Sequence, residues 1–280
     1  MIYSSFNGDA SATCPVADRG LQFGDGVFET MLCHAGVPLD FDAHWARLQH
    51  GCNRLGFACP DVRPAVLDVV RGHADRRAVA KLIVTRGCSQ RGYRAPVDPV
   101  ANWILTLSEA PRVDPAIYET GVAVTVCRTR LAREDDQLVG LKHLNRLTQV
   151  LARSEWVDEF HDGLLLDHAG AVVEGCASNV FAVTEGALVT PDLATGGVNG
   201  IVRRRVLAHA RASGLAVQER TLARAELEHA DEVFLTNSVY GVVPVRSIGA
   251  TRYPVGAVAR RMLDAIDPEH HFSTIPGSAR

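Results

Sequence analysis

The chain has 280 residues, 47 % of them hydrophobic, and a formal net charge of −3 at pH 7. This length and composition allow one large core or two moderate cores. The acidic balance disfavours a nucleic-acid partner, which usually binds a basic patch. No apolar run reaches the ~18 residues of a membrane span, and the first residues lack the pattern of a secretion signal. We therefore expect a cytoplasmic protein with no membrane partner.

The seven cysteines are odd in number and scattered along the chain. Zinc sites and disulfide frameworks require C-x-x-C pairs or regular spacings, and neither occurs here. We expect no metal ligands, and thiols that are reduced and mostly buried.

The N-terminal part of the chain predicts one long helix and two strands. Between residues 39 and 56, apolar side chains recur at helical spacing, and Gly56 provides a natural stop. Residues 78–87 and 102–110 have the apolar and β-branched composition of strands and end at turn-forming residues. We expect these elements to form a smaller α/β domain, residues 1–110.

Residues 111–120 are rich in proline and charge, which favours a linker between two domains. The larger domain would then comprise residues 121–280. Its predicted elements are, in chain order, a strand over 122–131, a helix over 143–160, hairpins over 162–175 and 178–191, a helix over 196–214, and a strand ending in a loop over 230–245. This mixture predicts an α/β fold with α+β character.

The densest basic cluster is the run Arg203–Arg205, within the predicted helix over 196–214. No aromatic side chain is interleaved with these arginines, as it would be on a nucleic-acid surface. We therefore expect this run to form a solvated helix face.

Lysine is nearly absent: only two of the 29 basic residues are lysines, Lys81 and Lys142. Arginine supplies a plain positive charge equally well. The two lysines therefore point to chemistry that arginine cannot perform, namely bonding to a carbonyl or proton exchange near neutral pH. A biased base composition of the genome explains the scarcity equally well. Lys142 directly precedes the predicted helix over 143–160, whose dipole disfavours a charged ammonium there.

Three further features meet the requirements of a phosphate-bearing pyridine cofactor. Glycines before the helix over 196–214 leave the N–H groups near Gly200 and Ile201 facing outward, as in anion sites. Glu174 ends an apolar strand and can hold a pyridine nitrogen protonated. Arg47 lies on the first predicted helix and offers a cation to the phosphate. Each feature alone also fits an ordinary turn, hairpin edge or surface position.

Seven motifs together resemble the fold-type IV, class IV aminotransferase-like enzymes, which use pyridoxal 5'-phosphate. In the family's order they are "RGLQFGDGVFET", "HWARL", "VTRGCSQRGY", "LKHLNRLTQVLAR", "VVEGCASNVF", "GGVNGIVR" and "FLTNSVYGVVPV". The fourth motif and the pattern RGxxxRGY are more typical of the family's aminodeoxychorismate lyases than of its transaminases. The resemblance implies β-elimination with aromatisation, which converts 4-amino-4-deoxychorismate to 4-aminobenzoate, a folate precursor, and pyruvate.

The resemblance also implies roles for individual residues. Lys142 is expected to bond covalently to the cofactor and to shuttle protons. Cofactor contacts are expected from Arg47, Lys142, Glu174, Gly200, Ile201 and Ser238. Substrate contacts are expected from Thr30, Lys81, Arg91, Tyr93 and Asn237. Lys81 and Arg91 have a simpler alternative as solvated surface charges. The family also implies a larger domain built as a pseudo-barrel and a homodimer of two identical chains.

Other functions remain open. A class IV transaminase for D-amino or branched-chain amino acids would use the same cofactor and Lys142, and release of pyruvate without an added keto acid would distinguish the lyase from it. A non-catalytic nucleic-acid binder would exploit the many arginines, but the chain lacks aromatic stacking platforms. A nicotinamide enzyme is disfavoured because no G-x-G-x-x-G motif follows a strand.

Overall fold

The computed structural model describes residues 1–269, 271 and 272, which divide into two compact units. The first unit comprises Met1–Pro111 together with Leu141–Asn145. The second comprises Arg112–Gly140 and the described residues from Arg146 onward. The short segment that carries Lys142, expected in the larger domain, therefore packs with the N-terminal unit.

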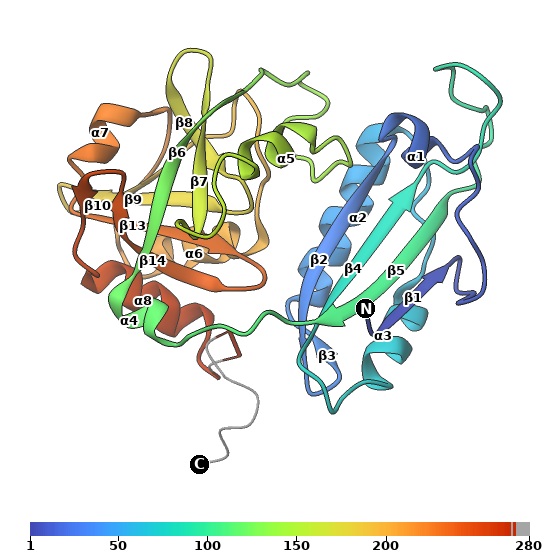
Figure 1. The fold of residues 1–280 in the computed structure, drawn as a ribbon, viewed down its shortest axis with the longest axis horizontal. Coiled ribbons are helices and arrows are strands. Elements are labelled where there is room, and N and C mark those ends of the chain that lie inside the picture. Colours follow the sequence, from blue (N-terminus) through green and yellow to red (C-terminus); the bar gives the residue numbers. More distant parts are fainter. Residues whose placement is uncertain (270, 273–280) are drawn as a thin grey trace. The chain divides into compact units, whose positions relative to one another are not determined.

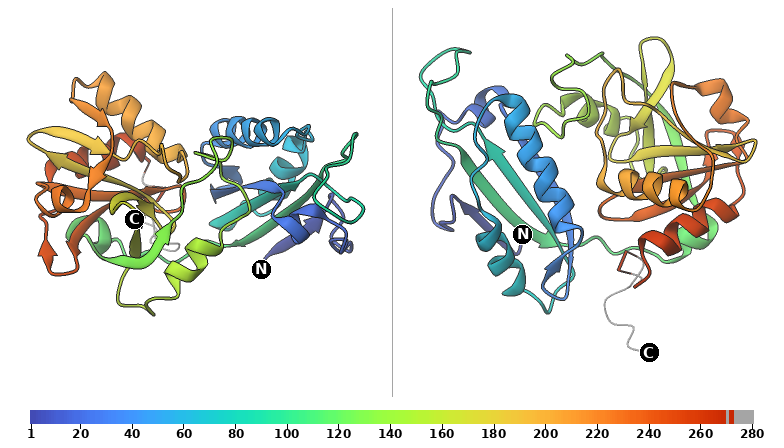
Figure 2. Two further views of the ribbon diagram at one scale, coloured as in Figure 1. Left: turned by 90° about the horizontal axis from the view of Figure 1, so that it is seen from above. Right: turned by 180° about the vertical axis from the view of Figure 1, so that it is seen from behind.

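The first unit is an antiparallel sheet with the strand order β1-β5-β4-β2-β3 (Figure 1). Its elements are β1 (Tyr3–Phe6), α1 (Arg19–Phe23), β2 (Gly26–His34), β3 (Val37–Pro38), α2 (Phe41–Leu55), α3 (Arg63–Arg71), β4 (Ala78–Thr85) and β5 (Asn102–Glu109). The helix and the two strands predicted for this part of the chain are confirmed as α2, β4 and β5. Helix α2 lies along one face of the sheet (Figure 2, right).

Strand β2 separates two environments, because alternate side chains of a strand point to opposite faces. Val27 and Met31 share a buried core with Trp45 of α2. Phe28 and Thr30 therefore lie on the face of the sheet that α2 does not cover. This division decides which functional groups can meet in the first unit.

Residues 112–120, which were expected to lie in a free linker, fold into the second unit. They include the short helix α4 (Ala116–Thr120). Val113 and Tyr118 are buried in the hydrophobic core of that unit, and the Tyr118 hydroxyl donates to the backbone carbonyl of Tyr240 at 2.9 Å. The linker prediction rested on the proline and charged residues of this segment. It did not take account of two apolar residues that anchor the segment to the core of the second unit.

The second unit is a curled sheet in which β6 and β7 cross the direction of β9 and β13 (Figure 1). The strand order is β11-β10-β9-β13-β14-β6-β7-β8-β12, with β15 paired to β14. The strands are β6 (Val122–Leu131), β7 (Asp162–Asp167), β8 (Ala171–Gly175), β9 (Asn179–Thr184), β10 (Ala187–Thr190), β11 (Val217–Glu219), β12 (Leu222–Ala223), β13 (Glu232–Asn237), β14 (Gly241–Ile248) and β15 (Thr251–Arg252). This curled sheet with its helices is the pseudo-barrel of mixed α/β composition that was expected for the larger domain.

The remaining helices of the second unit are α5 (Leu147–Arg153), α6 (Ile201–Ala212), α7 (Arg224–Glu228) and α8 (Ala257–Ile266). The predicted hairpins form as β7–β8 and β9–β10. Among the described residues, no helix of either unit combines the length and hydrophobicity needed to cross a membrane.

Helix α5 is much shorter than the helix expected over 143–160. Residues 141–146 are not helical, and the Phe28 N–H donates to the Lys142 carbonyl and the Leu144 N–H to the Gly26 carbonyl, each at 3.0 Å. These backbone bonds to β2 replace the first helical turns. The apolar face of α5 is largely exposed, with Leu147 at 70 % and Val150 at 61 %.

The run Arg203–Arg205 is not the solvated face that the sequence suggested. Arg203 is 3 % exposed, and its Nη2 donates to Glu219 Oε2 at 2.8 Å and to the Pro191 carbonyl at 2.9 Å. Arg204 is exposed, as expected. Consecutive helical residues point about 100° apart, so one arginine of the run faces the interior.

We expect Arg203→Met to lower the free energy of unfolding by about 2 kcal/mol, because it removes a buried ion pair and leaves the Pro191 carbonyl without its donor. Arg204→Met is the matched control and should change that free energy by no more than about 0.5 kcal/mol. Urea unfolding followed by circular dichroism measures both. If both substitutions lower the free energy of unfolding equally, the assignment of Arg203 as the buried arginine of the run is contradicted.

Candidate active site

The two lysines of the chain converge on one aromatic ring in the first unit. Lys142 Nζ lies 4.4 Å from the centroid of the Phe28 ring, and Lys81 Nζ lies 5.1 Å from it. Lys81 is directly opposite Thr30 in the β2–β4 register, so both side chains share the face of Phe28. An ammonium over an aromatic face gains about 0.5–2 kcal/mol, which favours this placement of both amines. Thr30, Lys81 and Lys142 therefore lie together on the face of β2 that carries Phe28.

Lys142 is held in place by its own backbone. Its segment lies alongside β2 through the bonds to Phe28 and Gly26, and His143 forms an isolated bridge with Val27. Lys142 thus lies outside any helix, five residues before α5 begins. The dipole of that helix does not act on its amine, because the effect is confined to the first turn. The expectation that a helix N-terminus neutralises Lys142 was wrong.

Arg47 lies on the opposite face of β2, in a buried cluster of charged side chains. Its Nε and Nη2 donate to Glu29 Oε1 and Oε2 at 2.7 and 2.5 Å, a bidentate pair. His44 Nδ1 is 2.6 Å from Glu29 Oε2. An ionised carboxylate can only accept, so His44 Nδ1 must carry the proton. This arrangement fixes the orientation of the Arg47 guanidinium.

Burial alone would raise the pKa of Glu29. The Arg47 guanidinium and the hydrogen bonds from Arg47 and His44 outweigh burial and lower that pKa to about 2. Glu29 is therefore ionised throughout the neutral range. Arg47 consequently retains a fixed counter-ion on its Nε and Nη2 side.

Arg91 and Tyr93 lie on the segment between β4 and β5, separate from the residues around Phe28. Both are exposed, Tyr93 at 86 %. The Tyr93 ring nevertheless packs against Phe23 of α1, with ring centroids 5.3 Å apart. Within the first unit, these two predicted substrate residues belong to a different part of the surface from Lys81 and Thr30.

Glu174 is the buried carboxylate of the second unit, at 4 % exposure on β8. Its Oε2 accepts from the Val198 N–H at 2.8 Å, and Gln149 Nε2 lies 3.4 Å from its Oε1. A Cβ on Gly197 would approach Glu174 Oε2 to 3.2 Å, and Gly197 has a φ of 93°. Glycine at this position therefore allows the loop to reach the carboxylate.

The same loop leads directly into α6, whose N-cap is Gly200. No side chain caps this helix, so its first N–H groups, beginning with Ile201, point out of the helix end. A Cβ on Gly200 would lie 2.1 Å from Asn179 Oδ1, so a side chain here would disrupt the loop. The carboxylate of Glu174 is thus bonded to the loop at Val198, two residues before the N-cap of α6.

Asn237 and Ser238 lie where β13 turns into β14. The structure forms a hairpin here, where the sequence suggested a strand ending in a loop. Asn237 Oδ1 accepts from the N–H groups of Val239 and Tyr240 at 2.9 and 2.8 Å, which shapes the turn. Ser238 is half-buried within this turn.

These groups fit pyridoxal phosphate. The uncapped start of α6 suits the phosphate, and the buried carboxylate fixed by the same loop suits a protonated pyridine nitrogen. Lys142, in the first unit, offers a primary amine of the kind that bonds to the carbonyl carbon. Among the described residues, no group of three His, Cys, Asp or Glu side chains could hold a metal ion, and the seven cysteines are free thiols.

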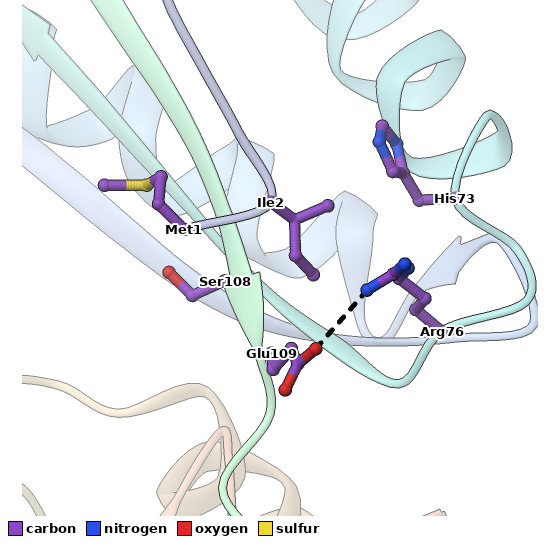
Figure 3. Close-up of a pocket in the computed structure, with 6 residues that line it drawn as sticks. All are labelled: Met1, Ile2, His73, Arg76, Ser108 and Glu109. Atoms are coloured by element: carbon purple, nitrogen blue, oxygen red, sulfur yellow. Dashed lines mark hydrogen bonds and ion pairs between the residues drawn. The ribbon is translucent and has the colours of Figure 1, made fainter.

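A cavity of about 630 Å³ lies at the edge of the first unit (Figure 3). It is lined by Met1, Ile2, His73, Arg76, Ser108 and Glu109. Arg76 Nη1 and Glu109 Oε1 form an ion pair there at 3.3 Å. None of the residues predicted to bind cofactor or substrate lines this cavity, so we assign it no role in catalysis.

Sequence reasoning missed the residues that support the predicted ones. Phe28 and Glu29 both belong to the motif "GDGVFET", in which only Thr30 was assigned a role. The alternation of that strand is a signal that Phe28 and Glu29 face opposite sides. Nothing in the sequence indicated that both lysines would lie over the Phe28 ring. Nor did it indicate that Glu29 would bind Arg47 and His44.

The sequence profile of the family described as amino-transferase class IV matches residues 26–248. The chain therefore belongs to the class IV aminotransferase family. It is 35 % identical to an aminodeoxychorismate lyase from Vibrio harveyi over 91 % of this chain and 96 % of that protein. It is 30 % identical to a D-alanine aminotransferase from Bacillus licheniformis over 86 % of this chain and 85 % of that protein.

Among solved structures, a 4-amino-4-deoxychorismate lyase from Pseudomonas aeruginosa superposes with a TM-score of 0.91. The two chains are 42 % identical, and the alignment covers 96 % of this chain and 100 % of the other. The chain is thus an enzyme with the fold-type IV architecture, and pyridoxal 5'-phosphate is its cofactor.

The low pKa of Glu29 generates a prediction about acid stability. Glu29→Gln should destabilise the protein by ~3 kcal/mol at pH 7, since folding lowers the pKa of Glu29 from its ordinary value of 4.5 to about 2. Because the folded pKa is depressed, this stabilisation is present above about pH 4.5 and is lost as the pH falls toward 2. The difference between the two proteins should therefore shrink by about half near pH 3.

Urea unfolding of both proteins from pH 7 to pH 3 measures this difference. Asp61→Asn is the control: the pKa of Asp61 is also lowered to about 2, by hydrogen bonding to Arg63, but this ion pair is exposed. We expect no measurable change from it. If the difference in free energy of unfolding between wild type and Glu29→Gln stays constant with pH, the lowered pKa of Glu29 is refuted.

Proposed function

We propose that this chain is a lyase that converts 4-amino-4-deoxychorismate to 4-aminobenzoate and pyruvate. The observation that carries the proposal is the likeness to the lyase from Pseudomonas aeruginosa, which extends over the whole of that chain at 42 % identity. A second lysine beside Lys142, on the same ring, supports it because the substrate is a dicarboxylate. The product would serve as a folate precursor.

Lys142 would perform the proton transfers. When bound, pyridoxal phosphate supplies an electron sink for the pair left behind when a C–H bond breaks. Lys142 Nζ, as a neutral amine, would take the proton from the ring carbon that bears the substrate's amine. The ether oxygen on the neighbouring carbon would leave with its electron pair, and Lys142 Nζ, now an ammonium, would protonate the departing enolpyruvate. Aromatisation of the ring makes the reaction effectively irreversible.

The other predicted cofactor residues would bind its two ends. Glu174 would accept a hydrogen bond from the protonated pyridine nitrogen. The phosphate would accept hydrogen bonds from the N–H groups near Gly200 and Ile201 at the start of α6. The Ser238 hydroxyl and the Arg47 guanidinium would bind it as well. The bidentate bond between Arg47 and Glu29 supports this role, because it orients the guanidinium in advance.

The substrate carboxylates would be bound by Lys81 and Arg91. Lys81 stands beside Thr30, whose hydroxyl can hydrogen-bond a carboxylate oxygen. Tyr93 would lie close to Arg91 on the same segment, and Asn237 would contribute its amide nitrogen. We further propose that the enzyme works as a cytoplasmic homodimer, in which either chain supplies these substrate contacts.

A class IV transaminase is the second candidate, and the 30 % identity to a D-alanine aminotransferase favours it. It would use the same cofactor and Lys142. It differs in requiring an added keto acid to accept the amino group. Turnover of 4-amino-4-deoxychorismate without a keto acid therefore separates the two functions.

We expect the purified enzyme to release 4-aminobenzoate and pyruvate in equal amounts from 4-amino-4-deoxychorismate without any added amino or keto acid. Liquid chromatography and a lactate dehydrogenase assay measure the two products. Reduction with borohydride should abolish both products. A yellow, reducible protein that yields neither product would move the function to transamination.

Lys142→Ala and Lys142→Arg should each remove nearly all turnover. Alanine has no amine, and arginine can neither bond to the cofactor's carbonyl nor lose its proton near neutral pH. Single-turnover kinetics on the cofactor-loaded variants measure the loss. Lys81→Arg is the control: it keeps the charge, so it should raise KM and retain measurable kcat. A wild-type rate in Lys142→Ala would rule out this mechanism.

A further inference from the structure

Arg19, the first residue of α1, is a buried arginine that the proposed reaction does not use. It is 4 % exposed, and its Nε donates to Asp25 Oδ2 at 2.7 Å. Asp25 is its counter-ion, and the remaining guanidinium donors are also occupied. They all reach one segment of the chain, residues 89–94, between β4 and β5.

The bonds from Arg19 to this segment are mostly to backbone carbonyls. Nη2 donates to the Tyr93 carbonyl at 2.9 Å, and Nη1 donates to Ser89 Oγ at 2.9 Å. Nη1 also lies within 3.4 Å of the carbonyls of Gly92 and Arg94. A planar guanidinium presents five donors in fixed directions, so one side chain can set the path of several residues at once.

Little else fixes the path of residues 89–94. Only its first residue makes a backbone bond, from the Ser89 N–H to the Ala17 carbonyl at 3.3 Å, and among the described residues no backbone–backbone hydrogen bond involves 90–95. Figure 1 shows this part of the chain extending from the end of β4 beside α1. Arg19 is thus the main polar anchor of residues 89–94.

Arg19 also takes part in a stack of side chains that ends at Tyr93. Its Cζ lies 5.1 Å from the centroid of the Phe23 ring, and that ring packs against Tyr93. Tyr93 is therefore held from two sides, through its carbonyl and through its ring, although its side chain is mostly exposed. An exposed aromatic ring on a positioned backbone is typical of a binding surface.

We propose that Arg19 is a positioning residue for substrate binding: it holds residues 89–94 so that Arg91 and Tyr93 are presented to the substrate carboxylate. This inference rests on the proposed function, which assigns those two residues to the substrate. Within the part of the chain that the structure describes, Arg19 forms no hydrogen bond to Lys142 or to the other cofactor-binding residues named above. Its effect is therefore expected on substrate affinity, with the chemical step unchanged.

Arg86 provides a matched control within the same ion-pair cluster. Its Nε also donates to Asp25 Oδ2, at 2.8 Å, and its side chain is similarly sheltered. Its Nη2 and Nη1, however, donate to the carbonyls of Leu55 and Gly56 at the end of α2. The two arginines thus share the counter-ion and differ in which segment they hold.

The first test measures the order of residues 89–94 without any substrate. Tyr93 is the only aromatic residue between 88 and 100, so chymotrypsin cleavage after Tyr93 reports on this segment. Lysine keeps the charge beside Asp25 but offers a single ammonium, so Arg19→Lys should accelerate this cleavage about tenfold, and Arg86→Lys should not. Phe23→Leu, which removes the ring beneath Tyr93, should act in the same direction. Equal cleavage of wild type, Arg19→Lys and Phe23→Leu would overturn the proposal.

The second test separates positioning from general stability. Arg19→Lys should raise KM about tenfold and leave kcat within about twofold, whereas Arg86→Lys should leave both unchanged. In the double variant with Arg91→Gln, Arg19→Lys should add little to the rise in KM, because its effect passes through Arg91. Additive effects of Arg19→Lys and Arg91→Gln on KM would refute the positioning role of Arg19. A fall in kcat with KM unchanged in Arg19→Lys would refute it too.

Failure of the proposed function would be recognised separately. If the wild-type enzyme releases no pyruvate, the lyase assignment fails, and the kinetic cycle is then run with D-alanine as the amino donor. The cleavage assay does not depend on the substrate. It decides by itself whether Arg19 holds residues 89–94.

Discussion

Two backbone hydrogen bonds to β2 are the constraint on which the site in the first unit depends. Through them, the segment Leu141–Asn145 lies alongside Phe28 and Gly26, although more than 110 residues separate these partners in the sequence. They place the Lys142 amine over the Phe28 ring and stop α5 from starting earlier. Because the bonds involve only backbone atoms, they fix the position of Lys142 independently of its side-chain chemistry. In the proposed reaction, the lysine would therefore keep its place while it exchanges bonds and protons.

The two faces of strand β2 carry different charged and aromatic side chains. One face carries a buried ionised glutamate that holds Arg47, and the other carries Phe28 with the two lysines. A single strand can do this because its side chains alternate with a period of two residues. The second unit separately brings Glu174 and the start of α6 together, through the loop bond to the Val198 N–H. In both units, backbone geometry fixes the positions of these side chains.

The predictions from sequence were most accurate where local pattern decides structure. The helix ending at Gly56 and the hairpins at β7–β8 and β9–β10 formed as expected, because apolar periodicity and turn residues are local signals. The helix after Lys142 was overestimated, since its first residues bond to a distant strand. The burial of Arg203 and of Tyr118 was also missed. Both depend on partners, such as Glu219 and the Tyr240 carbonyl, that lie outside any local window.

The sequence by itself determined the membership of the class IV family, because seven motifs in a fixed order carry that information without coordinates. It also identified the scarce lysines and the glycines before α6 as the features to examine. Only the tertiary structure decided that both lysines share one ring, that Glu29 and His44 orient Arg47, and that Arg19 holds the segment carrying Arg91 and Tyr93. The physical reason is that these contacts join residues far apart in the chain. Their distances and burial follow from how the strands pair and which faces they present, and spacing along the sequence does not record either.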